Sequence, residues 1–184
     1  METKYKNIHQ DLIDKCMDGN EQAQFGLYKI YYKSMYSVSL RIVNNTTEAE
    51  DVMQEAFLNA FRKIKTYKGE VSFGAWLKRI VVNRSLDILK KRKVFFEEIN
   101  EKITEMPNYE RGGKEVKVDQ IKKAIHKLPD GYRVVLSLYL IDGYDHDEIS
   151  QILGISNSAS RTQLLRAKKK LRELLKGKEI FSYN

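Results

Sequence analysis

Basic side chains crowd residues 157–175 of this chain, directly after a glycine turn. Residues 147–153 carry Ile149, Ile152 and Leu153 at helical spacing, residues 154–156 interrupt the pattern, and a second helical pattern follows. This order matches the helix-turn-helix, whose second helix fits the major groove of DNA. The second segment carries its positive charge on Arg161, Arg166, Lys168, Lys169, Lys170 and Arg172. A helix that lies between phosphates needs such charge, whereas a packing helix does not.

The turn residues favour the same interpretation. Gly154 can adopt the left-handed conformation that ends a helix. Ile155 can fill the core, and Ser156, Asn157 or Ser158 can cap the next helix. Two helices joined by a glycine turn are also common in all-helical proteins, and a basic face is often only a solvated face. Because turn length, capping residues and charge coincide, we favour DNA binding.

An enzymatic site is the alternative from another class. An acidic cluster surrounds one histidine: Asp142, Asp145, His146, Asp147 and Glu148. These groups could hold a metal ion, but acids are also favoured where a helix begins, and no second histidine lies at ligand spacing. The sequence contains no glycine-rich phosphate loop, HExxH or nucleophile elbow. We therefore expect no catalytic residue, no metal, no cofactor and no small-molecule substrate.

Composition limits the location and the partners. The net charge of +8 over 184 residues favours a polyanionic or acidic partner. Cys16 is the single cysteine, which excludes an internal disulfide, fits a reducing cytosol and predicts a buried packing side chain. The first residues lack the apolar core of a signal peptide, and nowhere do eighteen apolar residues run together. We expect a cytoplasmic protein.

Apolar periodicity is helical almost throughout, so the sequence predicts an all-α fold. Thr47 is a candidate N-cap, with Glu50 completing a capping box, and Ser72 is a candidate N-cap for a later helix. The predicted helices cover residues 7–17, 21–43, 48–64, 73 to the basic run at 90–93, 119–128, 132–140, 147–153 and the segment after 156.

Residues 94–116 differ in character from both flanking segments. They contain six glutamates, one proline and a glycine pair, and their periodicity is poor. We interpret them as a flexible acidic linker. The prediction is therefore two helical domains, residues 7–93 and 117–178, joined by this linker.

Both halves resemble the extracytoplasmic-function (ECF) sigma factors of the bacterial sigma-70 family. Residues 49–61, AEDVMQEAFLNAF, are similar to the family's AEDLVQEAFLRAW segment, and residues 73–83, FGAWLKRIVVN, to FRTWLYRIARN. In the second half, Leu128-Pro129, Glu148-Ile149, residues 153–156 (LGIS) and Arg166-Ala167 follow the pattern LP…EEIAEILGISVGTVKSRLSRA. The resemblance covers about residues 20–93 and 117–175, and its two motif sets occur in the family's order. It implies a sigma region 2 domain, a sigma region 4 domain and a role in promoter-specific transcription initiation.

The resemblance implies a polymerase-binding face on the first motif. Spacing of i, i+3, i+4 and i+8 aligns four polar side chains on one side of a helix. In the family this surface binds a coiled coil of the β′ clamp, so the implied contacts are Asp51, Gln54, Glu55 and Asn59. Carboxylates there would pair with a basic coiled coil. The alternative is a solvated helix face.

The loop at residues 65–72 and the helix after it correspond to the family's surface for reading and melting the −10 element. Aromatic or amide side chains can receive an unstacked base, and basic ones can hold phosphates. Phe73 and Trp76 also fall at core spacing, and packing is favoured for Trp76. The basic run could also be a solvated helix end favoured by the helix dipole. The implied contacts are Tyr67, Arg79, Asn83, Arg84, Lys90, Lys91 and Arg92.

The helix-turn-helix corresponds to the family's reader of the −35 element. Arginine can pair with guanine and glutamine with adenine. The implied contacts are Ser158, Ser160, Arg161, Gln163 and Arg166, with Lys168 and Lys169 on the DNA backbone. The sequence departs from the family at Gln163, often Arg, at Asn157, commonly Val, and at Ser160, usually apolar. The preferred promoter should therefore differ from the most familiar consensus.

The resemblance also implies partners. These are core RNA polymerase through its β′ clamp and β flap, promoter DNA, and an anti-sigma factor. In the family, the linker passes near the polymerase active centre, where its negative charge can mimic RNA; an ordinary spacer is the alternative. A DNA-binding regulator that acts without polymerase is a further alternative, although it would not need the polymerase-binding face.

Overall fold

A computed structural model describes residues 6–92 and 117–176, and the regular elements in those ranges are all helical. The chain divides into two compact units, Met1–Leu89 and Lys90–Asn184. The prediction of an all-α protein with two helical parts is confirmed. Lys93, the predicted linker at residues 94–116 and residues 177–178 lie outside the described residues.

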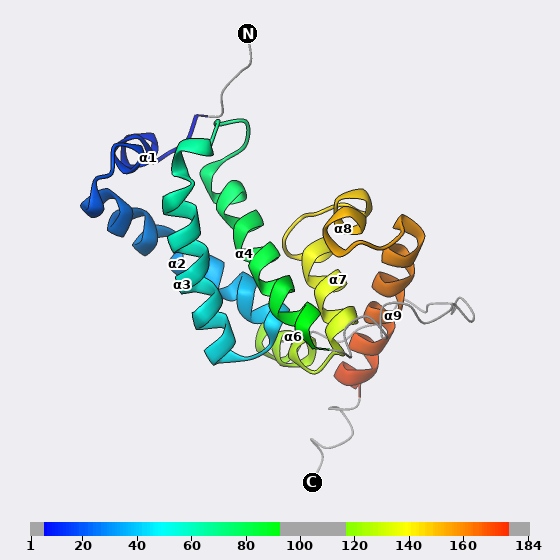
Figure 1. Cartoon of the computed structure of the whole chain (residues 1–184). Coiled ribbons are helices and arrows are strands. Elements are labelled where there is room, and N and C mark those ends of the chain that lie inside the picture. Colours follow the sequence, from blue (N-terminus) through cyan, green and yellow to red (C-terminus); the bar gives the residue numbers. More distant parts are fainter. Residues whose placement is uncertain (1–5, 93–116, 177–184) are drawn as a thin grey trace. The chain divides into compact units, whose positions relative to one another are not determined.

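The first unit is built on two long helices, α2 (Glu21–Val43) and α3 (Thr46–Arg62), which pack against each other (Figure 1). Helix α1 (Gln10–Met17) packs on α2, and the short 3-10 helix η1 (Ile64–Thr66) leads toward α4 (Phe73–Lys91). Cys16 is buried, and burial raises the pKa of its thiol, in keeping with a packing role.

Local capping explains where these helices begin. The Asn20 side chain accepts a hydrogen bond from the Ala23 backbone N–H at 2.9 Å and starts α2. The prediction that Thr47 caps α3 is wrong: Asn45 is the N-cap, its side chain accepts from the Glu48 N–H, and Thr47 lies within the helix. The asparagine that directly follows α2 is in the left-handed conformation, which leaves Asn45 extended and able to cap.

The second unit packs α6 (Val118–His126), α7 (Asp130–Leu140) and α8 (His146–Leu153) against α9 (Asn157–Lys176). Helix α7 is buried along most of its length, as its apolar sequence requires. Its Arg133 is buried as well, and the guanidinium donates to the Leu128 carbonyl at 2.8 Å and pairs with Asp130. The arginine therefore stabilises the turn between α6 and α7.

Among residues 6–92 and 117–176, no helix has the length and apolar character needed to cross a membrane.

Candidate nucleic-acid interface

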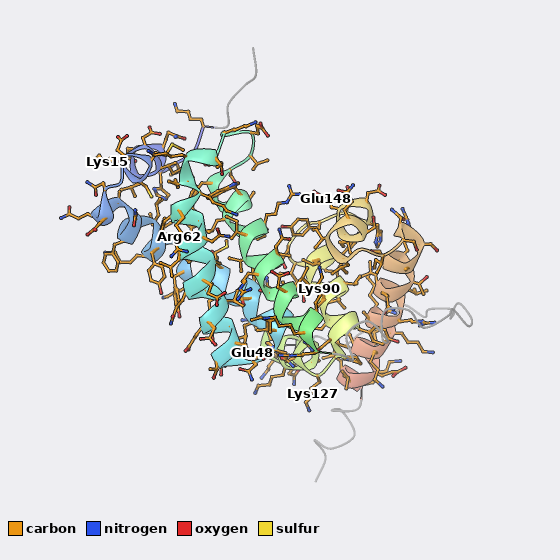
Figure 2. All side chains as sticks on the ribbon, in the orientation of Figure 1. Lys15, Glu48, Arg62, Lys90, Lys127 and Glu148 are labelled. Carbon is orange, nitrogen blue, oxygen red and sulfur yellow. The ribbon has the colours of Figure 1, made fainter. Side chains whose placement is uncertain are left out.

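Helices α8 and α9 form the predicted helix-turn-helix, and backbone chemistry defines its turn. Asp145 caps α8, and the Glu148 side chain accepts from the Asp145 N–H, which completes a capping box (Glu148 is labelled in Figure 2). Gly154 ends α8 with φ of 69°, the left-handed conformation expected of it. Of the three candidate caps for α9, Ser156 performs the role, since its Oγ accepts from the Ala159 N–H at 3.0 Å.

The predicted −35 residues divide between the surface and the interior of α9. Ser160 and Gln163 are buried, at 0% and 1% exposure, so their side chains do not reach the surface that would face a groove. This corrects the expectation that both contact bases. Ser160 takes a position where the family pattern has an apolar residue, and it lies on the same inward face as Gln163. Ser158, Arg161 and Lys169 are exposed, and Arg166 and Lys168 are half-buried.

A histidine explains the polar residue at Ser160. The Nδ1 atom of His146, in the first turn of α8, lies 2.8 Å from the Ser160 Oγ. The imidazole also stacks on Tyr139 of α7, with ring centroids 4.5 Å apart, and the Lys168 ammonium lies 5.9 Å from the Tyr139 ring centre. Burial, then Arg161 and Lys168, lower the pKa of His146, and Asp145 and Asp147 oppose that shift. The neutral imidazole therefore joins α7, α8 and α9.

The acidic cluster around His146 has structural roles. Asp145 and Glu148 form the capping box, and His146 contacts Ser160. Within the two described ranges, no group of three or more histidine, cysteine or acidic side chains is arranged to hold a metal ion. Sequence reasoning missed a different role for Asp147, whose carboxylate accepts a hydrogen bond from Asn157. The spacing of Asn157 and Arg161, one helical turn apart, was the available signal for a local pair.

In the first unit, the face predicted to bind polymerase is accessible on α3. Asp51, Gln54 and Glu55 are exposed, and Asn59 is half-buried. Figure 2 labels Glu48 and Arg62 at the two ends of this helix. The sequence prediction missed Leu58, which lies on the same face with 55% of its surface exposed. An exposed leucine among polar groups gives the face an apolar contact that charge alone does not supply.

Two residues assigned to different partners contact each other. Arg84 of α4 forms an ion pair with Glu55 of α3. The guanidinium that was expected to contact DNA is therefore engaged by the carboxylate that was expected to bind polymerase. Both side chains are partly exposed, so the pair contributes little to stability. The contact orients the two side chains toward each other.

The predicted −10 residues follow one exposed stripe of α4. Arg79, Asn83 and Lys90 are exposed and are spaced i, i+4 and i+11, which places them on one face of the helix. Lys91 is also exposed, and Arg92, just after the helix, is half-buried. As predicted, Ser72 caps α4, since its Oγ accepts from the Ala75 N–H at 3.2 Å.

Tyr67 does not belong to that stripe. Its ring is buried, at 6% exposure, against Phe73 and Trp76, with centroids 5.6 and 5.5 Å away. The burial corrects the expectation that Tyr67 receives a base. Trp76 packs against both Tyr67 and Phe73, which agrees with the packing role favoured from its spacing.

Asn7 was missed as a residue of this site. It is buried at 8% exposure, and its Nδ2 donates to the Tyr67 hydroxyl at 2.9 Å. Its Oδ1 accepts from the Phe73 backbone N–H at 2.8 Å, and the Tyr67 hydroxyl donates to the Val71 carbonyl at 2.6 Å. The segment before α1 thus holds both ends of the loop that leads into α4. No local sequence signal could reveal contacts between residues 60 and 66 positions apart.

Comparison with known proteins agrees with this architecture. Residues 27–94 match Sigma-70 region 2, and residues 119–171 match Sigma-70, region 4. The ECF RNA polymerase sigma factor SigW of Bacillus subtilis is 30% identical over 89% of this chain and 95% of its own length. The ECF RNA polymerase sigma-E factor of Escherichia coli K12 is 26% identical over 86% of this chain and 90% of its own.

Two solved structures share the fold. CnrH, in complex with the cytosolic domain of CnrY, has a TM-score of 0.56 at 24% identity and covers 90% of this chain and 96% of its own. The sigma factor RpoE of Bartonella quintana, in complex with the anti-sigma factor NepR, has a TM-score of 0.56 at 20% identity, covering 82% and 95%. The two regions in order, and the near full-length relatives, show that this chain belongs to the ECF sigma factors of the sigma-70 family.

Proposed function

We propose that this protein directs core RNA polymerase to specific promoters and initiates transcription there. The observation that carries the proposal is the presence of sigma regions 2 and 4, in order, in one chain that matches a sigma factor over 95% of that relative's length. The protein makes and breaks no bond itself, requires no cofactor or metal, and acts in the cytoplasm with the polymerase. The two functional domains are residues 7–93 and 117–178, and residues 94–116 join them.

The polymerase-binding face lies on α3 and comprises Asp51, Gln54, Glu55 and Asn59, with Leu58 at its centre. The exposed acids would steer a basic coiled coil of the β′ clamp, and burial of Leu58 would contribute affinity. The β flap would contact the second domain. Arg84 helps to orient Glu55 on this face rather than contacting DNA independently.

The DNA contacts lie on α9 and on α4. On α9, Ser158, Arg161 and Arg166 would meet base edges of the −35 element, and Lys168 and Lys169 would hold phosphates. On α4, Arg79 and Asn83 would meet the −10 element. Lys90, Lys91 and Arg92 would hold its backbone. Support comes from the full or partial exposure of these side chains and from the basic charge of both helices.

Control by an anti-sigma factor is the regulation we propose. The support is by analogy: the solved structure of RpoE from Bartonella quintana contains its anti-sigma factor NepR. Such a partner would cover the polymerase-binding face or hold the two domains.

Purified protein and core RNA polymerase, tested together on a pool of genomic promoter fragments, provide the decisive experiment. Co-elution in gel filtration and new, sequence-selective transcripts are expected. Selective binding of duplex DNA by the protein alone, with no association with core, would instead identify a DNA-binding regulator that acts without polymerase.

Charge reversal tests the polymerase-binding face. Asp51→Arg should abolish co-elution with core, because it places a cation against a basic partner. Asp11→Arg is the matched control, since Asp11 is an exposed acid on α1 outside the face. Equal co-elution by the two variants would show that polymerase binds elsewhere.

A further inference from the structure

Three polar side chains form a chain across the surface of the helix-turn-helix. The Asn157 Nδ2 donates to the Asp147 Oδ1 at 2.6 Å, and the Arg161 Nε donates to the Asn157 Oδ1 at 2.7 Å. A carboxylate can only accept and a guanidinium can only donate, so the amide has one orientation that serves both neighbours. The first turn of α8 thereby holds a side chain on the first turn of α9.

This arrangement determines which atoms Arg161 presents. The guanidinium is a rigid planar fork with five N–H donors, and Asn157 occupies the one on Nε. The two terminal Nη groups stay at the exposed end of the side chain. Their paired donors match the O6 and N7 acceptors of guanine in the major groove. Arg161 lies in the N-terminal part of α9, the part of a recognition helix that meets base edges.

We propose that Asp147 and Asn157 are positioning residues that preorganise Arg161 to recognise one guanine of the −35 element through its Nη atoms. The inference rests on the proposed function, which assigns DNA contact to α9. A free arginine side chain samples many rotamers, and binding must restrict them. The two hydrogen bonds already restrict the side chain before binding, so less conformational entropy is lost when DNA binds. Asp147 thus acts on specificity although its own charge repels phosphate.

The opposing effects of Asp147 distinguish this role from simple electrostatics. Asp147→Ala removes the acceptor for Asn157 and also removes a negative charge beside DNA, so binding to all sequences should strengthen or stay unchanged. If Asp147 positions the arginine through Asn157, preference for guanine should nevertheless fall. Glu173→Ala is the matched control, because Glu173 is an exposed acid on α9 whose Lys170 partner lies 3.4 Å away and outside the chain of three. It should leave base preference intact.

The experiment uses full-length protein in holoenzyme with core polymerase and promoter duplexes randomised across the −35 element. The Arg161→Ala variant locates the position read by Arg161, where a bidentate pair should give roughly 5- to 150-fold preference for guanine. At that position, Asn157→Val and Asp147→Ala should each lower the preference by about 3- to 10-fold. The exchange Asp147→Asn with Asn157→Asp should restore it, since the new amide at position 147 would donate to the new carboxylate at position 157, which would accept from Arg161.

Each outcome decides between the alternatives. Full guanine preference in Asn157→Val and Asp147→Ala, with loss only in Arg161→Ala, would overturn the positioning role and leave the proposed function intact. Preference for another base at the Arg161 position would overturn the guanine assignment. No change at any position in Arg161→Ala would overturn the inference and the placement of Arg161 on bases together. Recovery of preference in the exchange variant is the result that a purely structural role for Asn157 does not predict.

Discussion

Replacing Asn7 with alanine should destabilise the first unit through a loop far away in sequence. Asn7 bridges the start of the chain to the segment between Tyr67 and Phe73. Removing its side chain leaves the Phe73 backbone N–H, on a fully buried residue, without the Oδ1 acceptor. The Tyr67 hydroxyl loses one partner but keeps its bond to the Val71 carbonyl.

The magnitude follows from these contacts. A buried polar group left unsatisfied costs about 1–3 kcal/mol. The Phe73 N–H should bear most of that penalty, and Tyr67 less, so we expect a loss of about 2 kcal/mol in the free energy of unfolding. With a urea m-value of about 1–2 kcal/mol/M for a small domain, the midpoint of unfolding should fall by roughly 1–2 M.

Trp76 provides the assay, because it is the single tryptophan of the chain and its ring lies 5.5 Å from the ring centres of Tyr67 and Phe73. Its fluorescence during urea unfolding reports on this unit. Gln10→Ala is the control, since Gln10 is a partly exposed neighbour that accepts from Asn7 and donates to Asp14 in an exposed hydrogen bond. Asn7→Ala with Tyr67→Phe should show a coupling energy of about 1 kcal/mol in a double-mutant cycle. A midpoint for Asn7→Ala equal to that of Gln10→Ala would refute the reasoning.

Three other outcomes are expected. Because burial, Arg161 and Lys168 lower the pKa of His146, the unfolded chain gains the proton first. The contribution of His146 to stability is therefore fully present above its unfolded pKa of about 6.5 and is lost as pH falls further. His146→Asn should flatten the decline in melting temperature below about pH 6.5, and an unchanged decline would contradict this. Asp130→Ala leaves the buried Arg133 guanidinium without its carboxylate and should lower the free energy of unfolding by about 3 kcal/mol in thermal unfolding. This value is near the low end for a broken buried pair, because Asp130 is partly exposed. Asp130→Ala with Arg133→Met should recover much of that loss, and failure to do so would argue against an uncompensated charge. Lys169→Ala should reduce the slope of log K against log salt for holoenzyme binding to −35 duplexes by about 0.9, equally for all sequences. A sequence-selective effect would instead place Lys169 on a base.

Local chemistry in the sequence was sufficient for much of the fold. Ser72 and Gly154 act where predicted, because capping and left-handed turns depend on residues a few positions apart. The cap of α3 was not predicted correctly, because it depended on backbone geometry. Asn45 rather than Thr47 caps α3, since the left-handed residue before Asn45 sets where the helix can start.

Interior polar contacts could not be predicted in this way. Ser160 and Gln163 look like surface residues in a polar, basic helix, yet both face inward. Helical periodicity places residues on a common face, but only packing against α6, α7 and α8 decides which face of α9 is covered. Ser160 is tolerated inside because His146 reaches it.

The sequence by itself determined an all-α chain with sigma regions 2 and 4, the helix-turn-helix, and which segments carry charge, since these depend on short-range patterns. The tertiary structure decided that Tyr67 is buried, that Asn7 holds its loop, and that Asp147 contacts Asn157, which in turn contacts Arg161. The physical reason is the range of the interaction. A hydrogen bond needs its two atoms within about 3 Å, and only the folded chain brings together groups from different helices or distant loops.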